Sequence, residues 1–282
     1  MSSLIQPLST SNHDRDRAGL RYVYPVVSRR AGGVSIGINL NPNNACNWAC
    51  IYCQVPDLVR GGPPPLDMAL LEQELNRMLD DVQTGDFMQT QVPPEARHLM
   101  DVAFSGNGEP TSAPEFADAV ALVLRVLRER SLDQLAVRVI TNGSLVRREY
   151  VQEGLRRLAE VNGEVWFKVD AMTPERMQLI NGVNQGADTV LPRLRLAAGI
   201  APTWVQTCMM QVDGAAPTET EIENYLAMLS AVRNEIRGVL LYGLARPSMQ
   251  PGADRLAALP ATWLEEMGRR IDALGIDVKV SP

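Results

Sequence analysis

The sequence alternates short β-branched, apolar runs with amphipathic stretches at helical spacing, and this alternation constrains the fold more than any other feature. Repeated β–α units place their strands in parallel, because each helical crossover returns the chain to the same end of the sheet. Six such units suit a partial (β/α)6 TIM barrel better than a closed eightfold one, although periodicity alone also allows a doubly wound open sheet. The expected strands cover residues 34–40, 101–105, 135–140, 164–169, 203–211 and 239–242.

Helix-capping sequences separate these strands. A capping box from Ser112 to Glu115 is expected to open the second helix, and Thr218 begins another capping box. Thr173 stands before a proline, which is the pattern of an N-cap with proline in the first turn. The expected helices cover residues 67–81, 115–130, 147–159 and 218–237, with two more beginning at 173 and 262. The run from Thr262 to Glu265 is expected to cap the last of them.

Length and charge indicate a compact α/β protein. The 282 residues are expected to form an N-terminal extension (1–30), a core domain (31–250) and a C-terminal helix and strand packed on the core (251–282). No apolar run reaches the ~18 residues that a membrane span needs, and residues 1–30 lack the apolar stretch of a secretion signal. A cytoplasmic protein with no membrane partner is therefore expected. The net charge of −6 gives no general attraction for nucleic acid.

Three of the four cysteines, Cys46, Cys50 and Cys53, are spaced C-x3-C-x2-C. Three thiolates at this spacing can hold a cubane iron–sulfur cluster, which ordinarily takes four cysteines, so one iron would keep a position for a non-protein ligand. A structural zinc site needs four ligands and usually a second ligand pair, which Cys208 and the two histidines do not supply. Disulfide frameworks belong to small secreted domains. The spacing favours a cluster and leaves zinc and structural roles open.

Polar and glycine-rich runs follow most of the expected strands. In a barrel, the loops after the carboxyl ends of the strands meet at one mouth and carry the functional groups. The cysteine loop follows the first strand, and the other runs lie at 105–111, 141–144, 168–171 and 242–248. This placement favours the barrel over the open sheet.

The cysteine spacing, combined with the run Gly-Asn-Gly-Glu at 106–109, resembles the radical S-adenosylmethionine (SAM) superfamily over roughly residues 36–243. Residues 28–39 and the pair Cys53-Gln54 are similar, more narrowly, to the tRNA four-demethylwyosine (wybutosine) synthase-like subgroup and its bacterial relatives. The resemblance implies a [4Fe-4S] cluster on the three cysteines, with SAM on the cysteine-free iron. It further implies reductive cleavage of SAM to a 5′-deoxyadenosyl radical, which abstracts hydrogen from a substrate.

The resemblance also assigns contacts to the adenosine part of SAM. Tyr52, between the second and third cysteines, matches the position expected near the adenine. Asn142 and Ser144 stand where many relatives hold the ribose hydroxyls, although their run also suits an ordinary loop opening.

The methionine part of SAM is expected at the strand-two loop. Gly106 and Gly108 allow a close backbone approach to its amino or carboxylate group, and Glu109 is expected to fix the ammonium. The family often has two adjacent glycines here, whereas Asn107 separates them in this chain. Without the cysteine loop, residues 106–109 would also be consistent with an ordinary turn.

Lys168 and Asp170 alternate with apolar residues at the end of the fourth strand, so both are expected to point into the barrel and to bind SAM. A buried ammonium needs a partner. Lys168 would hold the SAM carboxylate, pair with Glu109 or Asp170, or form a Schiff base, and these alternatives stay open. Arg246, after the last strand, is expected with Ser248 to grip a substrate phosphate or carboxylate. Lys168 and Arg246 are the candidate catalytic residues.

The expected partners are an unidentified small metabolite or peptide as substrate and a low-potential electron donor such as flavodoxin or ferredoxin. RNA modification is suggested by the wyosine-like run, with Arg29 and Arg30 as a local basic patch, and is opposed by a pI near 5.1. Cys208 is expected to be an inert small hydrophobe, with hydrogen donor or methyl acceptor as the alternatives. A non-enzymatic metal-binding protein is the remaining hypothesis.

Overall fold

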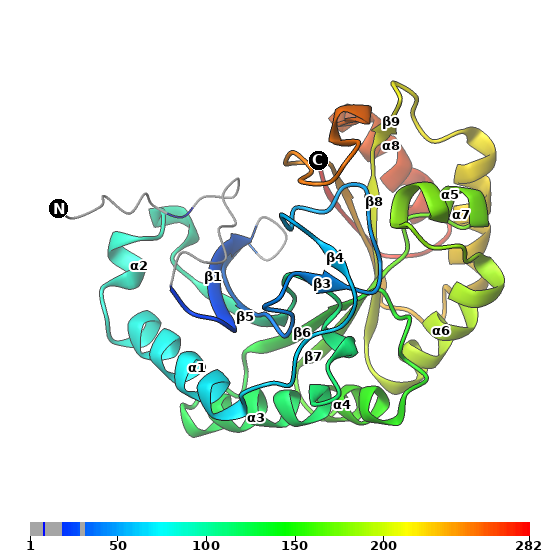
Figure 1. Ribbon diagram of the computed structural model, residues 1–282. Helices are drawn as coiled ribbons and strands as arrows, with labels where there is room; N and C mark the ends of the chain where they lie inside the picture. The colour runs from blue at the N-terminus through cyan, green and yellow to red at the C-terminus, as the bar shows by residue number, and fades with distance from the viewer. Residues whose placement is uncertain (1–7, 9–18, 29–31) are drawn as a thin grey trace.

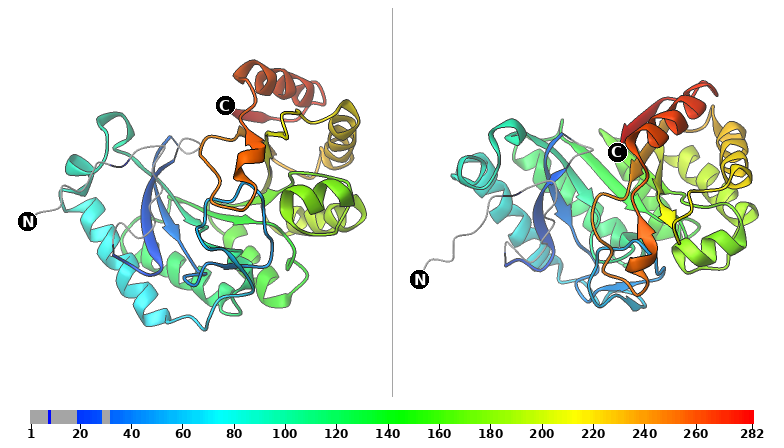
Figure 2. Two further views of the ribbon diagram at one scale, coloured as in Figure 1. Left: turned by 45° about the horizontal axis from the view of Figure 1, so that its top comes forward. Right: turned by 90° about the horizontal axis from the view of Figure 1, so that it is seen from above.

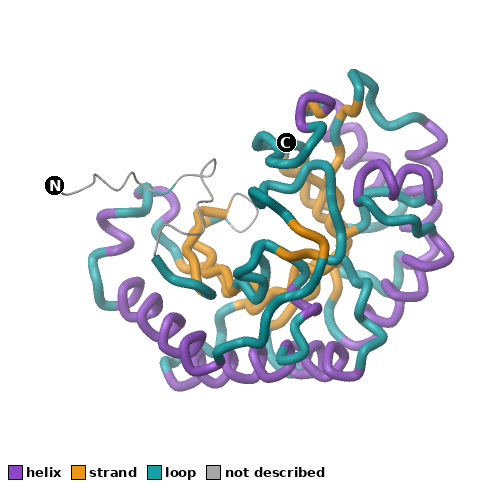
Figure 3. The backbone as a smooth tube through the Cα atoms, in the orientation of Figure 1, coloured by secondary structure: helices purple, strands orange, loops and turns teal. Residues whose placement is uncertain are grey.

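The computed structural model describes residues 8, 19–28 and 32–282 of the chain. Eight strands form one open sheet that curls into a half-barrel, with helices along its outer face (Figure 1). The tube view shows the strands gathered on the inside of the curve and the helices outside it (Figure 3). In spatial order the strands are β1 (Val23–Ser28), β2 (Gly33–Ile38), β5 (Leu99–Phe104), β6 (Ala136–Thr141), β7 (Gly163–Lys168), β8 (Thr203–Met209), β10 (Gly238–Gly243) and β12 (Val278–Ser281).

The order of the strands identifies the barrel. β1 pairs antiparallel with β2, and every later neighbouring pair in the sheet is parallel. From β2 to β12 the spatial order follows the chain without a reversal, whereas a doubly wound sheet reverses at a switch point. The partial TIM barrel is confirmed, and β1 and β12 extend its six expected strands at the two edges.

The longer helices cover the outer face of the sheet because they turn apolar residues toward it. In α3, Phe116, Val120, Val123 and Leu127 recur at helical spacing and are buried. The Phe116 ring meets Phe104 of β5 edge to face, with 5.9 Å between the ring centroids. The helices are α1 (Met68–Gln83), α2 (Phe87–Thr90), α3 (Phe116–Glu129), α4 (Glu149–Ala159), α5 (Pro174–Asn181), α6 (Ala187–Ile200), α7 (Glu219–Val232) and α8 (Ala261–Asp272).

The predicted helix starts agree with the structure at two of four capping sites. At the last helix the prediction is wrong, because α8 begins at Ala261 with Pro260 as its N-cap, so Thr262 lies inside the helix. Thr173 caps α5, and Thr218 forms the predicted capping box of α7. The capping box from Ser112 to Glu115 is wrong. The Ser112 hydroxyl instead donates to the Glu109 carbonyl within a short 3-10 turn. The turn ends at Ala113, which is extended, and α3 begins only at Phe116.

The sequence reading missed β1, which falls within the predicted N-terminal extension. β1 lies flat on the edge of the barrel because Gly37 in β2 leaves room for its Tyr24 ring, which a Cβ at Gly37 would approach to 2.1 Å. The Tyr24 hydroxyl is 2.9 Å from the Ser105 hydroxyl at the end of β5. The predicted boundary at residue 30 lies outside the described residues, and the domain division stays a prediction.

Two short ladders shape the loops above the half-barrel. β3 (Ala45–Cys46) pairs with β4 (Val59–Arg60) at the two ends of the cysteine loop, and β9 (Gln211–Val212) pairs with β11 (Leu256–Ala257). The segment between β10 and β11 lies beside the cysteine loop in both views of Figure 2. Among the described residues, no helix combines the length and apolar character required to cross a membrane.

Candidate active site

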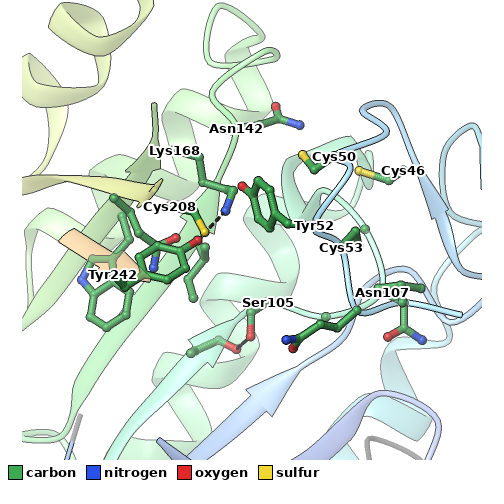
Figure 4. Close-up of a pocket in the computed structure, with 18 of the residues that line it drawn as sticks. Cys46, Cys50, Tyr52, Cys53, Ser105, Asn107, Asn142, Lys168, Cys208 and Tyr242 are labelled. Atoms are coloured by element: carbon green, nitrogen blue, oxygen red, sulfur yellow. Dashed lines mark hydrogen bonds between the residues drawn. The ribbon is translucent and has the colours of Figure 1, made fainter. Parts of the chain in front are cut away.

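A cavity of about 290 Å³ lies inside the half-barrel, at the carboxyl ends of its strands. Figure 4 shows the three cysteines of the cysteine loop, Cys46, Cys50 and Cys53, on one side of the cavity. Lys168, Tyr242 and Cys208 lie on the other side. Ser144 and Asp170 are not among the residues that line it. The predicted site residues that do line it are Cys46, Cys50, Tyr52, Cys53, Gly106, Gly108, Glu109, Asn142, Lys168 and Arg246.

The three loop cysteines are partly exposed, and the thiols of Cys46 and Cys50 are largely shielded from water. Burial raises the pKa of Cys50 to about 12, and burial likewise raises the pKa of Cys46 to about 11. Trp48, only 3% exposed, packs into the main core beside them. A thiolate in such a setting is stabilised by a bound metal, which exchanges for the thiol proton. These sulfurs are therefore suited to ligation rather than to solution chemistry.

Two distant segments hold the backbone of the cysteine loop. At the end of α5, backbone carbonyls accept hydrogen bonds from the amides of Ala49 and Ile51, at 3.0 and 2.8 Å. After β10, the Ser248 hydroxyl donates to the Ile51 carbonyl at 2.6 Å, and the Gln250 amide group donates to the Val55 carbonyl at 2.6 Å. The Ser248 hydroxyl therefore helps to hold the cysteine loop, and its expected contact with substrate stays a prediction.

The two predicted ribose-binding residues belong to a small amide network. The Asn142 side chain donates to the Asn47 side chain at 2.9 Å, and Asn47 donates to the Ser144 hydroxyl at 2.8 Å. The Ser144 amide donates back to the Asn142 side-chain oxygen. The network ties the loop after β6 to the cysteine loop. Sequence reasoning missed Asn47, whose only signal was its polar character between two ligand cysteines.

Glu109 is 3% exposed, and its carboxylate joins the loop after β5 to the end of β6 and the loop that follows it. Its Oε1 accepts from the Thr111 hydroxyl and the Thr141 hydroxyl, both at 2.6 Å, and from the Thr111 amide at 3.1 Å. Its Oε2 accepts from the Asn142 amide at 2.7 Å. Burial raises the pKa of Glu109, although these hydrogen bonds act in the opposite direction. Most of its acceptor capacity is used within the protein, so only Oε2 has room for a further donor.

Lys168 faces the cavity between two aromatic rings. Its ammonium lies 5.0 Å from the centre of the Tyr52 ring and 3.1 Å from the Tyr242 hydroxyl, to which it donates. Burial lowers the pKa of Lys168, but the charges of Tyr242, Asp170 and Cys50 outweigh it and raise the pKa overall. Among the described residues, no carboxylate lies within ion-pair distance of its ammonium. The arrangement provides a positive charge that a ligand can approach.

Asp170 faces away from the cavity, in contrast to the expectation that it points inward. Its Oδ2 accepts from the Tyr52 hydroxyl and from the Asn181 side chain, and its Oδ1 accepts from the Cys208 amide at 2.9 Å. The strand β7 ends at Lys168, so the alternation of side chains does not continue to Asp170. Burial raises the pKa of Tyr52, which keeps its phenol protonated as the donor.

Arg246 lies at the rim, where its Nη1 donates to the Gln54 side chain at 3.2 Å. Cys208 is 3% exposed and lines the cavity beneath it. Arg29 and Arg30, the predicted basic patch, lie outside the described residues, and the RNA hypothesis that includes them stays a prediction.

The deep part of the cavity contains polar groups that the sequence reading did not identify. Arg138 pairs with Asp101 and, at 3.0 Å, with Glu164, which forms a charged floor across β5, β6 and β7. Above it, Gln206 is 1% exposed, and its Nε2 has no hydrogen-bond partner among the described residues. The signal available in the sequence was the polar side chain of Gln206 within a strand of mainly apolar residues.

The fold and the site define a class of enzyme that combines a three-cysteine loop with a partial barrel. A protein-family model described as the radical SAM superfamily matches residues 40–215, which is more than half of the chain. The chain belongs to the radical SAM superfamily. Membership implies an iron–sulfur cluster and SAM as cofactors.

A single curated protein matches over a limited length. A GTPase Obg of Brachyspira hyodysenteriae is 25% identical over 185 residues, which is 64% of this chain and 24% of that protein. This chain therefore spans about a quarter of that relative.

Solved structures share the fold at low sequence identity. SuiB of Streptococcus suis, bound to the precursor peptide SuiA, has a TM-score of 0.56 and 11% identity, covering 87% of this chain and 48% of SuiB. A radical SAM methyltransferase from Sphaerobacter thermophilus has a TM-score of 0.56 and 14% identity, with coverages of 88% and 66%. A spore photoproduct lyase with bound AdoMet and dinucleoside spore photoproduct has a TM-score of 0.54 and 10% identity, with coverages of 87% and 75%.

The residues present suit an iron–sulfur cluster. Within the described part of the chain, no three His, Cys, Asp or Glu side chains gather around one metal-ion position. In a cubane cluster each cysteine binds a different iron, so the sulfurs need to face one cavity rather than meet at one atom. Cys46, Cys50 and Cys53 meet that requirement, since all three line the same cavity.

Proposed function

We propose that this chain is a radical SAM enzyme that holds a [4Fe-4S] cluster through Cys46, Cys50 and Cys53 and acts on a small metabolite or a peptide. The observation that carries the proposal is the single cavity shared by these cysteines, the buried Glu109 and the ammonium of Lys168. Bound there, the cluster would supply the one-electron reduction that cleaves SAM to methionine and a 5′-deoxyadenosyl radical.

Opposite charges on two walls of the cavity support an orientation for SAM. Glu109 Oε2 is suited to the methionine ammonium, and Lys168 is suited to its carboxylate, because hydrogen bonds between charged groups are the strongest available. Gly106 has a φ of +152°, and a Cβ there would lie 2.4 Å from Asn39 Oδ1, so the backbone approaches closely at this turn. A Cβ at Gly108 would lie 2.1 Å from the Ala45 carbonyl oxygen, so both glycines let this loop pack closely on the segment before the cysteines, and in this proposal the loop borders the methionine part of SAM.

The adenosine part has its own candidate contacts. Asn142 lines the cavity and is suited to a ribose hydroxyl, while Asn47 and Ser144, which do not line the cavity, hold its side chain through the amide network. Tyr52 offers its ring face at the cavity wall while Asp170 fixes its hydroxyl from behind. Asp170 in this account positions Tyr52 and does not contact SAM.

The deeper cavity suits the substrate. Gln206 presents an unpaired donor there, and a buried donor without a partner costs about 1–3 kcal/mol, which a substrate oxygen would recover. Trp166 and Ile140 supply apolar walls. Arg246 at the rim is suited to a carboxylate or phosphate on the substrate. SuiB, which shares the fold, is bound to a precursor peptide, and this supports a peptide as one candidate substrate for this chain.

Anaerobic reconstitution tests the proposal. The protein would be loaded with iron and sulfide, reduced with dithionite or with flavodoxin or ferredoxin, and incubated with SAM. Chromatography should then detect 5′-deoxyadenosine, and none should form in a Cys50→Ala variant, since its cluster loses a ligand. Reconstituted wild-type protein that carries iron and sulfide yet forms no 5′-deoxyadenosine would contradict the proposal.

A further inference from the structure

Asn181, at the end of α5, contacts one of the candidate cluster ligands. Its side chain is completely buried, and its Nδ2 lies 3.4 Å from Cys50 Sγ and 2.8 Å from Asp170 Oδ2. Its Oδ1 has no hydrogen-bond partner among the residues that the structure describes. The side chain therefore makes its polar contacts as a donor, to a sulfur and to a carboxylate.

The orientation of the Asn181 amide follows from its neighbours. One hydrogen of Nδ2 is directed to the Asp170 carboxylate, which leaves the other for the Cys50 sulfur. The flipped amide would place its oxygen against a carboxylate and a thiolate, which are both acceptors. Asp170 itself is held by the Cys208 backbone amide and by Tyr52, so it provides a fixed reference for the amide.

Backbone hydrogen bonds hold the end of α5, and with it the Asn181 side chain, against the cysteine loop. The carbonyls of Asn181 and Ile180 accept the amides of Ala49 and Ile51, on either side of Cys50 in the chain. Gly182 then ends α5 with a φ of +67°, and a Cβ there would lie 2.9 Å from the Ala49 carbonyl oxygen. The helix end is consequently docked on the cysteine loop, with the Asn181 side chain directed at Cys50.

We infer that Asn181 is a positioning residue that raises the reduction potential of the cluster by donating an N–H hydrogen bond to Cys50 Sγ. This inference rests on the proposed function, in which Cys50 ligates the cluster. Hydrogen bonds to ligand sulfurs are one of the factors that set cluster potentials. The donor withdraws electron density from the thiolate and favours the reduced cluster, which carries one more negative charge. Loss of the donor should therefore shift the potential to more negative values.

The test is a potentiometric titration of the reconstituted protein, followed by electron paramagnetic resonance (EPR). Asn181→Leu keeps a similar volume without polar atoms, and Asn181→Ser retains a hydroxyl that is too short to reach the sulfur. Asn41→Ala serves as the matched control, because Asn41 is 1% exposed and its side chain donates to the Ala45 carbonyl and the Ser112 hydroxyl rather than to a sulfur. Both Asn181 variants should show a more negative midpoint potential at wild-type iron content, while Asn41→Ala should keep the wild-type potential.

The outcomes separate this inference from the proposed function. Equal midpoint potentials in wild type and either cluster-loaded Asn181 variant would overturn the inference and leave the proposed function intact. Failure of both variants to retain iron and sulfide would show a structural role, and would also overturn it. Absence of a reducible cluster from the wild-type protein would instead count against the proposed function.

Discussion

Glu109→Gln is a sharp test of how the site is assembled. The substitution keeps the size of the side chain and an oxygen at Oε1, which retains the three hydrogen bonds from Thr111 and Thr141. At the position of Oε2 it places an amide nitrogen. That nitrogen is a hydrogen-bond donor, and it faces the Asn142 backbone N–H, also a donor, at 2.7 Å. One charge-assisted hydrogen bond is lost, and a buried N–H is left without a partner.

The expected loss of stability follows from the change at Oε2. A hydrogen bond to a charged acceptor contributes about 1.5–3 kcal/mol. Relief of the buried charge at neutral pH offsets part of this, because burial raises the pKa of Glu109. We expect the free energy of unfolding to fall by about 1–3 kcal/mol, and SAM binding to weaken because Asn142 loses its fixed position.

The pH dependence has a definite sign. A folded-state pKa above the unfolded value of about 4.5 means that the folded protein binds more protons at Glu109. The stabilisation from this group is fully present below pH 4.5 and is lost as the pH rises through the folded-state pKa. The advantage of wild type over Glu109→Gln should therefore shrink from low to high pH.

Urea unfolding of the apoprotein, followed by tryptophan fluorescence at several pH values, measures both effects. Glu149→Gln is the matched control, because the Glu149 side chain is 78% exposed and its ion pair contributes about 0–1 kcal/mol. A Glu109→Gln protein as stable as wild type at every pH, or a difference that grows with pH, would refute the reasoning.

Further predictions concern three residues that line the cavity. Lys168→Ala should weaken SAM binding about tenfold or more, as expected for loss of a charged hydrogen bond of about 1.5–3 kcal/mol, with calorimetry as the assay; unchanged SAM cleavage and product formation would rule out its role. Arg246→Ala should spare uncoupled SAM cleavage and abolish substrate turnover, whereas loss of both would indicate misfolding or cofactor loss. Gln206→Met should raise the free energy of unfolding by about 1 kcal/mol in urea, because it removes a buried unpaired donor; a loss of stability would show that Nε2 is satisfied in solution.

Local patterns predicted most of what depends on neighbours in sequence. The β–α alternation gave the six barrel strands to within a few residues, and Thr173 and Thr218 marked the starts of α5 and α7. The three cysteines were found because their spacing is itself the signal. β1 was missed because it gains its stability from pairing with β2 and from the space left by Gly37, neither of which a six-residue segment reveals.

Contacts between distant residues limited the prediction of the site. Asn181 lies 131 positions from Cys50, and no local pattern distinguishes it from a polar residue at a helix end. Asp170 was expected in the cavity because strand alternation was extended beyond Lys168, where the strand ends. Ser248 was placed near the substrate because it lies in the loop after the last strand, and its hydrogen bonds to the cysteine loop had no signal in the sequence.

The central claim is that the three cysteines leave one iron open for SAM. The most direct measurement is the EPR spectrum of the reduced, reconstituted protein with and without SAM. We expect a [4Fe-4S] signal whose g values change when SAM is added, because the ligands of the open iron change. A cluster signal that SAM leaves unaltered, at SAM concentrations that saturate relatives of this fold, would contradict the account.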